Sequence, residues 1–236
     1  MTILGIDTSS KACSCALTKD GQLLSENVMN LGLTHSQTLM PAVDALYAQA
    51  QLSPADTDLF AAVTGPGSFT GVRIAVCTVK ALCLALNKPC AAIDALEALA
   101  EGTTYEGYIS PILDARRGQV YTALFQREGG TLRRVSEDEA LPLDAWLTWL
   151  TRLRPYGNVC FTGDGLNTYE EQISAFSELK AQIADGCSRY LRASAACLIA
   201  ERDKSTLTDA ERLAPKYLRL SQAERERNER LSRQRV

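Results

Sequence analysis

Short apolar stretches dominate the first 30 positions of the chain. Residues 3–8, 12–18 and 22–29 have the composition of strands, and the last two are joined by an Asp20-Gly21 step, which is a strong signal for a β-hairpin. We therefore expect the chain to open with three antiparallel strands.

A helical pattern begins at Thr34 and continues to residue 51. Leu39 and Val43 recur on one helical face, and Thr34 and Gln37 have the spacing of a capping box. Pro41 lies inside this pattern and predicts either a kink or a later start of the helix, because proline lacks the amide hydrogen that a helix interior needs.

Strands and helices then alternate as far as residue 100. We expect a strand over 59–64, a turn over 65–67, a helix over 70–86, a strand over 90–93 and a helix that Asp94 caps. The predicted order is βββαβαβα, and the polar stretch 101–107 is expected to link this lobe to a second one.

The second half repeats this order of elements without repeating the residues. Expected strands cover 108–113, 119–126, 131–135 and 158–162, and expected helices cover 142–153, 167–179 and 193–202. The sequence thus predicts a two-lobed α/β protein with lobes at 1–101 and 102–220, followed by a charged tail at 221–236.

Composition is that of a globular protein. Of 236 residues, 46% are hydrophobic and 22% are charged, which excludes disordered and collagen-like classes. The net charge of −3 provides no excess of Lys and Arg to neutralise phosphates, so contact with RNA is expected only locally or through a partner. No basic segment precedes the first apolar stretch, and no apolar run approaches the roughly 18 residues of a membrane span, so we expect a cytoplasmic chain without membrane contact.

Eight cysteines and one histidine restrict the available chemistry. The cysteines, Cys77 among them, are scattered through apolar stretches without a CxxC pair, so we expect them to be buried small hydrophobic residues. Cys13 and Cys15 alternate on one strand and are assigned to packing. His35 is expected to have a surface or capping role. A single histidine excludes a two-His metal site, and no metal is predicted.

The stretch Gly65-Pro66-Gly67-Ser68-Phe69-Thr70-Gly71-Val72-Arg73 is the most informative motif. It fits neither the dinucleotide fingerprint nor the P-loop, and Ser68 lacks the flanking glycines of a nucleophile elbow. Two interpretations stay open. The turn either has a role in nucleotide binding or at an interface, with free amides that could hold an anion, or caps the helix through Ser68 while its glycines let two backbones approach. The candidates for nucleotide or anion contact are Asp7, Gly65, Gly67, Ser68 and Gly71.

Two aspartates occupy matching places in the two predicted lobes. Asp7 ends the first strand of the first lobe, and Asp114 ends the first strand of the second. Such a pair either holds a metal-bound nucleotide in a cleft or caps two turns, and the sequence leaves both alternatives open.

A βββαβα unit used twice, with these aspartates, resembles the actin, hexokinase and Hsp70 type of fold, which has two RNase H-like lobes. That fold usually binds ATP between its lobes. This chain departs from its phosphate hairpins, with Ser9 at the expected glycine of the first and Ala115-Arg116-Arg117 in the second.

Five segments resemble the TsaB (YeaZ) family more closely: residues 3–9, 35–41, 65–74, 114–121 and 215–219. The resemblance implies a bacterial subunit of the machinery that places threonylcarbamoyl on N6 of adenosine 37 in tRNAs reading codons that begin with A. It implies an accessory subunit and not the transferase, because the catalytic paralogue TsaD holds a metal with a His pair where Ala95 and Leu99 stand here. Aliphatic side chains are not metal ligands.

The resemblance also implies partners, namely a TsaD-like catalytic paralogue, a TsaE-like ATPase and a second copy of the chain when it is alone. The implied contact uses the helices at 35–51 and 70–86, with Leu39, Val43, Arg73, Val76 and Lys80 as interface candidates. No cofactor is expected on this chain alone, whereas ATP or ADP and a metal are expected in the partner complex, and tRNA is expected to be contacted only indirectly. Ala75 and Cys77 stand where the family has glycines, which implies wider or re-angled packing there.

Two other functions stay open. An ATP-dependent kinase or ATPase of the same fold would need Gly-rich phosphate hairpins and a catalytic carboxylate. A peptidase would need a metal site or an activated nucleophile, and the sequence provides neither pattern.

Overall fold

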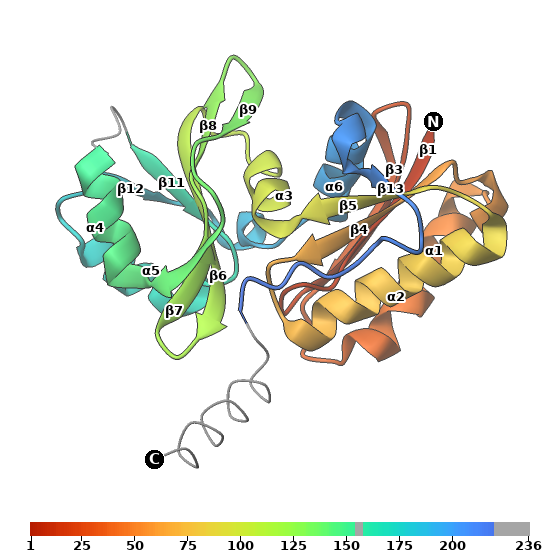
Figure 1. Cartoon of the computed structure of the whole chain (residues 1–236), viewed down its shortest axis with the longest axis horizontal. Coiled ribbons are helices and arrows are strands. Elements are labelled where there is room, and N and C mark those ends of the chain that lie inside the picture. Colours follow the sequence, from red (N-terminus) through yellow and green to blue (C-terminus); the bar gives the residue numbers. More distant parts are fainter. Residues whose placement is uncertain (154–157, 220–236) are drawn as a thin grey trace, which may run out of the picture.

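The computed structural model describes residues 1–153 and 158–219, so the predicted charged tail at 221–236 lies outside the described residues. Two sheets stand side by side, and helices flank each of them (Figure 1). This is the two-lobed α/β architecture that the alternation of strands and helices predicts.

The first sheet has six strands in the order β13-β5-β4-β1-β2-β3. Their bounds are β1 (Thr2–Asp7), β2 (Cys13–Lys19), β3 (Gln22–Met29), β4 (Leu59–Gly65), β5 (Cys90–Asp94) and β13 (Leu207–Thr208). β1 to β3 form the predicted antiparallel meander, while β4 runs parallel to β1 and β5 parallel to β4. The order β3-β2-β1-β4-β5 is that of an RNase H-like lobe, so the predicted fold class is confirmed.

The second sheet has the path β10-β7-β6-β11-β12, with β8 paired to β6 and β9. The bounds are β6 (Gly107–Arg116), β7 (Gln119–Thr122), β8 (Phe125–Glu128), β9 (Thr131–Arg134), β10 (Glu139–Pro142), β11 (Val159–Thr162) and β12 (Ala181–Ile183). The strand predicted over 119–126 is broken at Ala123-Leu124. β7 pairs with the second half of β6, and β8 pairs with its first half.

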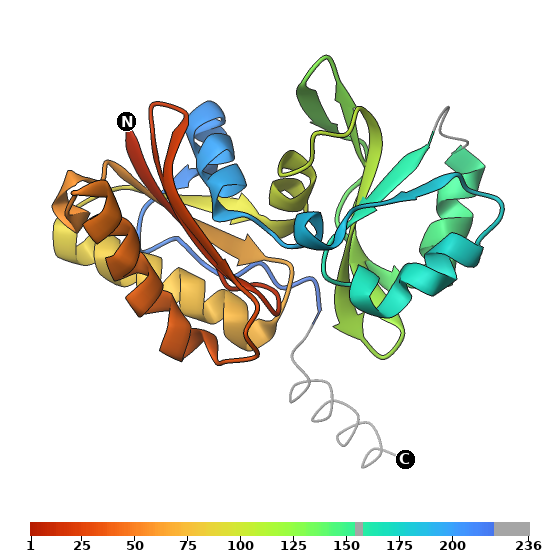
Figure 2. The ribbon, with the colours of Figure 1, turned by 180° about the vertical axis from the view of Figure 1, so that it is seen from behind.

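Helices cover both faces of the first sheet. The helices are α1 (His35–Ala50), α2 (Phe69–Leu86), α3 (Ala95–Glu101), α4 (Leu143–Leu153), α5 (Leu166–Ala175) and α6 (Ala193–Arg202), with short 3-10 turns at Pro54–Asp56, Gly186–Arg189 and Lys204–Thr206. α1 and α2 lie on the outer face, where they pack on Leu4, Ile6 and Phe60. α3 and α6 lie between the two sheets (Figure 2). The core around them includes Ile109 and Phe125 of the second sheet, so the lobes share a core.

The predicted division at residue 102 assigns α6 and β13 to the second lobe, but both pack on the first sheet. α6 packs on β1 and β2, and β13 extends the first sheet beside β5. Ala193 N–H donates to Ser14 Oγ at 2.9 Å, and Arg192 forms an ion pair with Glu26 of β3. Residues from 193 onward therefore belong to the first lobe. The order of elements along the chain does not reveal on which sheet an element packs.

α1 begins at His35 and continues through Pro41, so the later start that proline suggested is wrong. Thr34 is the N-cap, but its hydroxyl bonds to Gln37 Oε1 at 2.8 Å, not to a backbone amide. The capping box is therefore not formed, although the boundary of the helix is the predicted one.

α2 is apolar and long enough, by length and composition, to cross a membrane, which contradicts the expectation that no run reaches this length. One such helix is weak evidence for a span, since core helices pass the same test. Val72, Val76 and Val79 are buried in the core beneath α1 and α2, as in a helix packed on its own sheet. Only 33% of the residues of α2 are buried, however, so a helix of high mean hydropathy turns apolar side chains to its outer face.

Candidate functional site

The Gly-rich turn before α2 docks directly on the hairpin after β1. Ser68 N–H donates to Ser9 O at 2.6 Å, and Thr8 Oγ1 donates to Gly71 O at 2.7 Å. A Cβ on Gly67 would overlap the carbonyl of Ser9, and one on Gly71 would overlap the carbonyl of Thr8. The glycines are therefore needed for the close approach of two backbones.

The first turn of α2 uses its own donors locally. Ser68 is the N-cap, and its side chain accepts from Gly71 N–H at 3.2 Å. Val72 N–H donates to Ser68 O. The structure thus brings together the five candidates Asp7, Gly65, Gly67, Ser68 and Gly71. The hydrogen bonds support the interpretation in which the turn caps α2 and docks on the hairpin after β1. A contact with an anion stays a prediction.

Asp7 and Asp114 form matching turns in the two lobes. Asp7 Oδ1 accepts from Ser9 N–H at 2.8 Å, and Asp114 Oδ1 accepts from Arg116 N–H at 2.7 Å. Each carboxylate therefore bonds the amide two residues further on, as the turn-capping alternative requires. Asp7 is completely buried, and within residues 1–153 and 158–219 its Oδ2 has no hydrogen-bond partner. Burial raises the pKa of Asp7 from 3.8 to about 7.

Replacing Asp7 by Asn is expected to flatten the pH dependence of stability. The native state holds the Asp7 proton more tightly than the unfolded chain, so Asp7 costs increasing stability as pH rises from 3.8 to about 7. Relative to the wild type, Asp7→Asn should gain about 2 kcal/mol of unfolding free energy between about pH 5.5 and about pH 8. Urea unfolding of both proteins at the two pH values measures this difference, and a difference that does not vary with pH would contradict it.

A cavity of about 310 Å³ lies between the turn that follows Asp7 and the turn that follows Asp114, in the cleft between the lobes. Its charged lining is mixed, with Lys11, Arg116, Lys216 and Arg219 beside Asp114 and Asp164. Asp164 accepts from Lys11 N–H at 3.2 Å, which ties the lobes together at the floor of the cleft. Burial raises the pKa of Asp164.

The segment 209–219, here called the C-terminal strap, runs from β13 across the first lobe and into this cleft (Figure 1). Lys216 N–H donates to Thr64 O at 2.7 Å, and Arg219 Nη1 donates to Ala115 O at 2.9 Å in the second lobe. The Tyr217 ring stacks on Phe69 at 4.6 Å. The strap therefore contacts both lobes, a role that its motif did not reveal in the sequence.

Four charged side chains form a cluster where the strap meets both lobes, here called the interlobe clamp: Asp94, Arg134, Asp138 and Lys216. Lys216 Nζ lies 2.9 Å from Asp94 and also pairs with Asp138, while Arg134 pairs with both aspartates. Burial raises the pKa of Asp138, and the hydrogen bond with Asp94 raises it further. For Asp94, the bond with Asp138 and the charges of Lys216 and Arg134 outweigh burial and lower the pKa.

Three of the five interface candidates are misplaced. Leu39, Val43 and Val76 are buried in the core beneath α1 and α2 and do not reach the surface. Apolar residues that recur at helical spacing mark the face that a helix packs against its own sheet. Choosing interface residues by this spacing therefore selected the buried face of each helix and not the exposed one.

The other two candidates lie on the surface and contact the strap. Arg73 covers Phe69 at 3.9 Å and donates to Tyr217 Oη at 2.7 Å, and Lys80 Nζ donates to Glu211 O. Ala75 is buried, and its N–H donates to Thr8 Oγ1 at 3.1 Å, so its methyl group does not reach the surface of α2.

The outer face of α1 and α2 instead exposes other apolar residues. Leu84 is 69% exposed and Met40 is 41% exposed, and Cys77 lies on the exposed side of α2. Leu31 and Leu33, in the segment that leads into α1, are also exposed. We call Met40, Cys77 and Leu84 the helical face. These residues do not belong to the apolar positions that recur at helical spacing and pack on the sheet, so the search for that spacing did not identify them.

The expectation that all cysteines are buried is wrong for Cys77 and Cys187, which are exposed. The other six are buried, and Cys13 and Cys15 share the core beneath α1 and α2 as predicted. His35 lies at the start of α1, where Nε2 is 2.9 Å from Ser10 O.

The residues at the expected position of the TsaD histidines are part of the core. Ala95 and Leu99 of α3 are buried between the lobes. In the part of the chain that the structure describes, no group of three or more His, Cys, Asp or Glu residues is arranged to hold a metal ion.

Comparison with known proteins identifies the relatives of the chain. A family model described as TsaD, tRNA N6-adenosine threonylcarbamoyltransferase, matches residues 31–227. The tRNA threonylcarbamoyladenosine biosynthesis protein TsaB of Bacillus subtilis is 37% identical over 226 residues, which cover 95% of this chain and 96% of that protein. Its counterpart in Escherichia coli is 34% identical over 60% of this chain and 62% of that protein.

Solved structures agree with this assignment. The structure of YeaZ from Pseudomonas aeruginosa superposes with a TM-score of 0.74 at 28% identity, covering 92% of this chain and 99% of that one. The two-lobed fold, the docked Gly-rich turn and the similarity along nearly the whole chain together show that the chain belongs to the TsaB (YeaZ) family of tRNA threonylcarbamoyladenosine biosynthesis proteins.

Proposed function

We propose that this chain is a non-catalytic activating subunit of the cytoplasmic complex that transfers threonylcarbamoyl to N6 of adenosine 37 in tRNA. It binds a TsaD-like catalytic paralogue through the helical face, and a TsaE-like ATPase with ATP or ADP joins the assembled complex. Without that partner, two copies of the chain pair through the same face.

The observation that carries this proposal is the exposure of the helical face. Leu84, in the last turn of the apolar helix α2, has 69% of its surface exposed, and Met40 is exposed on the neighbouring helix. Cys77 and Leu84 are seven residues apart and so lie on one side of α2, and exposed apolar surface gathered on one side of a helix is typical of protein interaction sites. The burial of Ala95 and Leu99 supports an accessory role, since neither side chain is a metal ligand.

Leu84→Asp is expected to weaken binding to the TsaD-like protein of the same organism by at least about tenfold, because it places a charge in a contact that excludes water. Size exclusion with light scattering, followed by titration calorimetry, measures the change. Leu198→Asp is the matched control, because Leu198 is 40% exposed on α6, across the sheet from the helical face. The control should bind like the wild type.

Cys77 provides a second readout that needs no substitution. Its thiol should be protected from alkylation in the complex, whereas exposed Cys187 in the second lobe should stay reactive. Unchanged binding by Leu84→Asp together with unprotected Cys77 would refute the helical face as the contact. ATP turnover by the purified chain alone would refute the non-catalytic role.

A further inference from the structure

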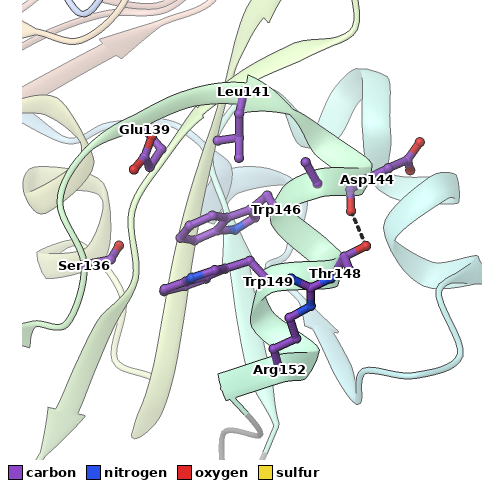
Figure 3. Close-up of a pocket in the computed structure, with 9 residues that line it drawn as sticks. Ser136, Glu139, Leu141, Asp144, Trp146, Thr148, Trp149 and Arg152 are labelled. Carbon is purple, nitrogen blue, oxygen red and sulfur yellow. Dashed lines mark hydrogen bonds between the residues drawn. The ribbon is translucent and has the colours of Figure 1, made fainter.

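A hollow of about 550 Å³ opens on the second lobe, between α4 and the segment 136–141 (Figure 3). Trp146 and Trp149 project from α4 into it, with Leu141 above them and Glu139 and Ser136 on the facing segment. The chain has two tryptophans, and both line this hollow. It is separate from the cleft and from the helical face.

The two indoles form a rigid platform. Trp146 is 1% exposed, and its Nε1–H donates to Ser110 Oγ at 2.9 Å on β6. The Trp149 ring stacks on Trp146 with centroids 4.7 Å apart and an interplanar angle of 18°, and it is only partly buried. The buried ring therefore fixes the orientation of the accessible one before any ligand arrives.

Most polar groups of the hollow already have partners within the protein. Ser136 Oγ accepts from Leu124 N–H, Thr148 Oγ1 donates to Asp144 O, and Asp144 Oδ1 accepts from Gln172. Glu139 and Arg152 are exposed, and among residues 1–153 and 158–219 neither side chain has a hydrogen-bond or ion-pair partner. The hollow thus offers an aromatic surface with one acceptor and one cationic donor beside it.

We propose that this hollow binds a nucleotide unit, with the base on the Trp149 platform, a phosphate at Arg152 and an amino group of the base at Glu139. Stacking on an aromatic side chain accepts any base, and Arg is suited to phosphate by charge and geometry. A purely apolar ligand would desolvate both charges without a partner, so it fits less well. The net charge of −3 does not oppose a contact that uses one arginine.

Tryptophan emission tests the proposal on the chain alone, because it reports only on this hollow. The probes are adenosine, guanosine and cytidine monophosphates, the corresponding nucleosides, and unmodified tRNA, with inner-filter correction against N-acetyltryptophanamide. We expect saturable quenching by the mononucleotides, and binding of the nucleosides that is at least about fivefold weaker. If tRNA binds more tightly than a mononucleotide, the ligand is RNA; the reverse order identifies a free nucleotide.

Variants separate recognition from folding. Arg152→Ala should weaken the binding of phosphate-bearing probes by at least about fivefold and leave the binding of nucleosides unchanged. Arg133→Ala is the control, because it removes the same charge from an exposed position on β9. Trp149→Phe should retain binding that Trp149→Ala loses, measured by calorimetry, with circular dichroism to confirm folding. The proposal would be overturned if tryptophan emission stayed unchanged up to millimolar mononucleotide and with tRNA. It would also be overturned if Arg152→Ala and Arg133→Ala weakened the binding of phosphate-bearing probes equally.

Discussion

Gly71→Ala should destabilise the chain by about 3 kcal/mol or more. Its Cβ would sit on the carbonyl oxygen of Thr8, which is backbone and has no other position to take. Relieving the overlap means moving α2 away from β1. That movement would break the bonds from Thr8 Oγ1 to Gly71 O and from Ala75 N–H to Thr8 Oγ1.

Urea unfolding followed by circular dichroism measures this effect. Gly186→Ala is the control, because a Cβ at Gly186 would meet nothing within 4 Å, and its stability should stay within about 0.5 kcal/mol of the wild type. If Gly71→Ala unfolded at the same urea concentration as the wild type, the docking of the Gly-rich turn on the hairpin would not be the constraint that we infer.

Lys216→Met is expected to loosen the two lobes and to lower stability by about 2 kcal/mol. Breaking a buried ion pair typically costs about 3–5 kcal/mol, and the 46% exposure of Lys216 reduces this through solvent screening. The substitution leaves Asp94 and the nearly buried Asp138 together, with Arg134 as their remaining cation in the clamp.

Hydrogen exchange distinguishes a loosened clamp from general destabilisation. Amide protection should fall in β4, α3 and β9, where the clamp joins the lobes, while β11 keeps its protection. Lys204→Met is the control, since Lys204 is exposed and its Nζ donates to the Glu201 carbonyl three residues earlier, outside the clamp. Equal exchange in both variants would show that the lobes are held by their shared core alone.

Local patterns predicted the fold well where strands are long and helices amphipathic. The β1–β3 meander, α1, α2 and α6 follow from their residues. β10, β12 and β13 have only two to four residues and were missed. The four-residue β9 and β11 were recognised because β9 follows Gly129-Gly130 and β11 is an apolar run, and the missed strands lack such signals. The placement of α6 was wrong for another reason: the contact of Arg192 with Glu26 joins residues 166 positions apart, and local pattern holds no information about it.

The candidate site was predicted unevenly for a similar reason. The residue types allowed the interpretation in which Ser68 caps the helix and the glycines let two backbones approach, and the structure agrees with it. Leu39, Val43 and Val76 were chosen for apolar periodicity, which reports burial within a chain and not contact with a partner. The strap joins Lys216 to Asp94 and Asp138, and only the folded chain brings these three together.

The return of α6 and β13 to the first sheet sets an order for synthesis on the ribosome. The residues of the second sheet, 107–183, are contiguous and have all been made before α6 emerges. The first sheet, although its opening strands are translated first, lacks α6 on its inner face and the strand β13 at its edge until residues 193–208 leave the exit tunnel. The lobe begun first is therefore completed last, and Ile3 and Ala16 remain without the α6 cover until after the second sheet has been made.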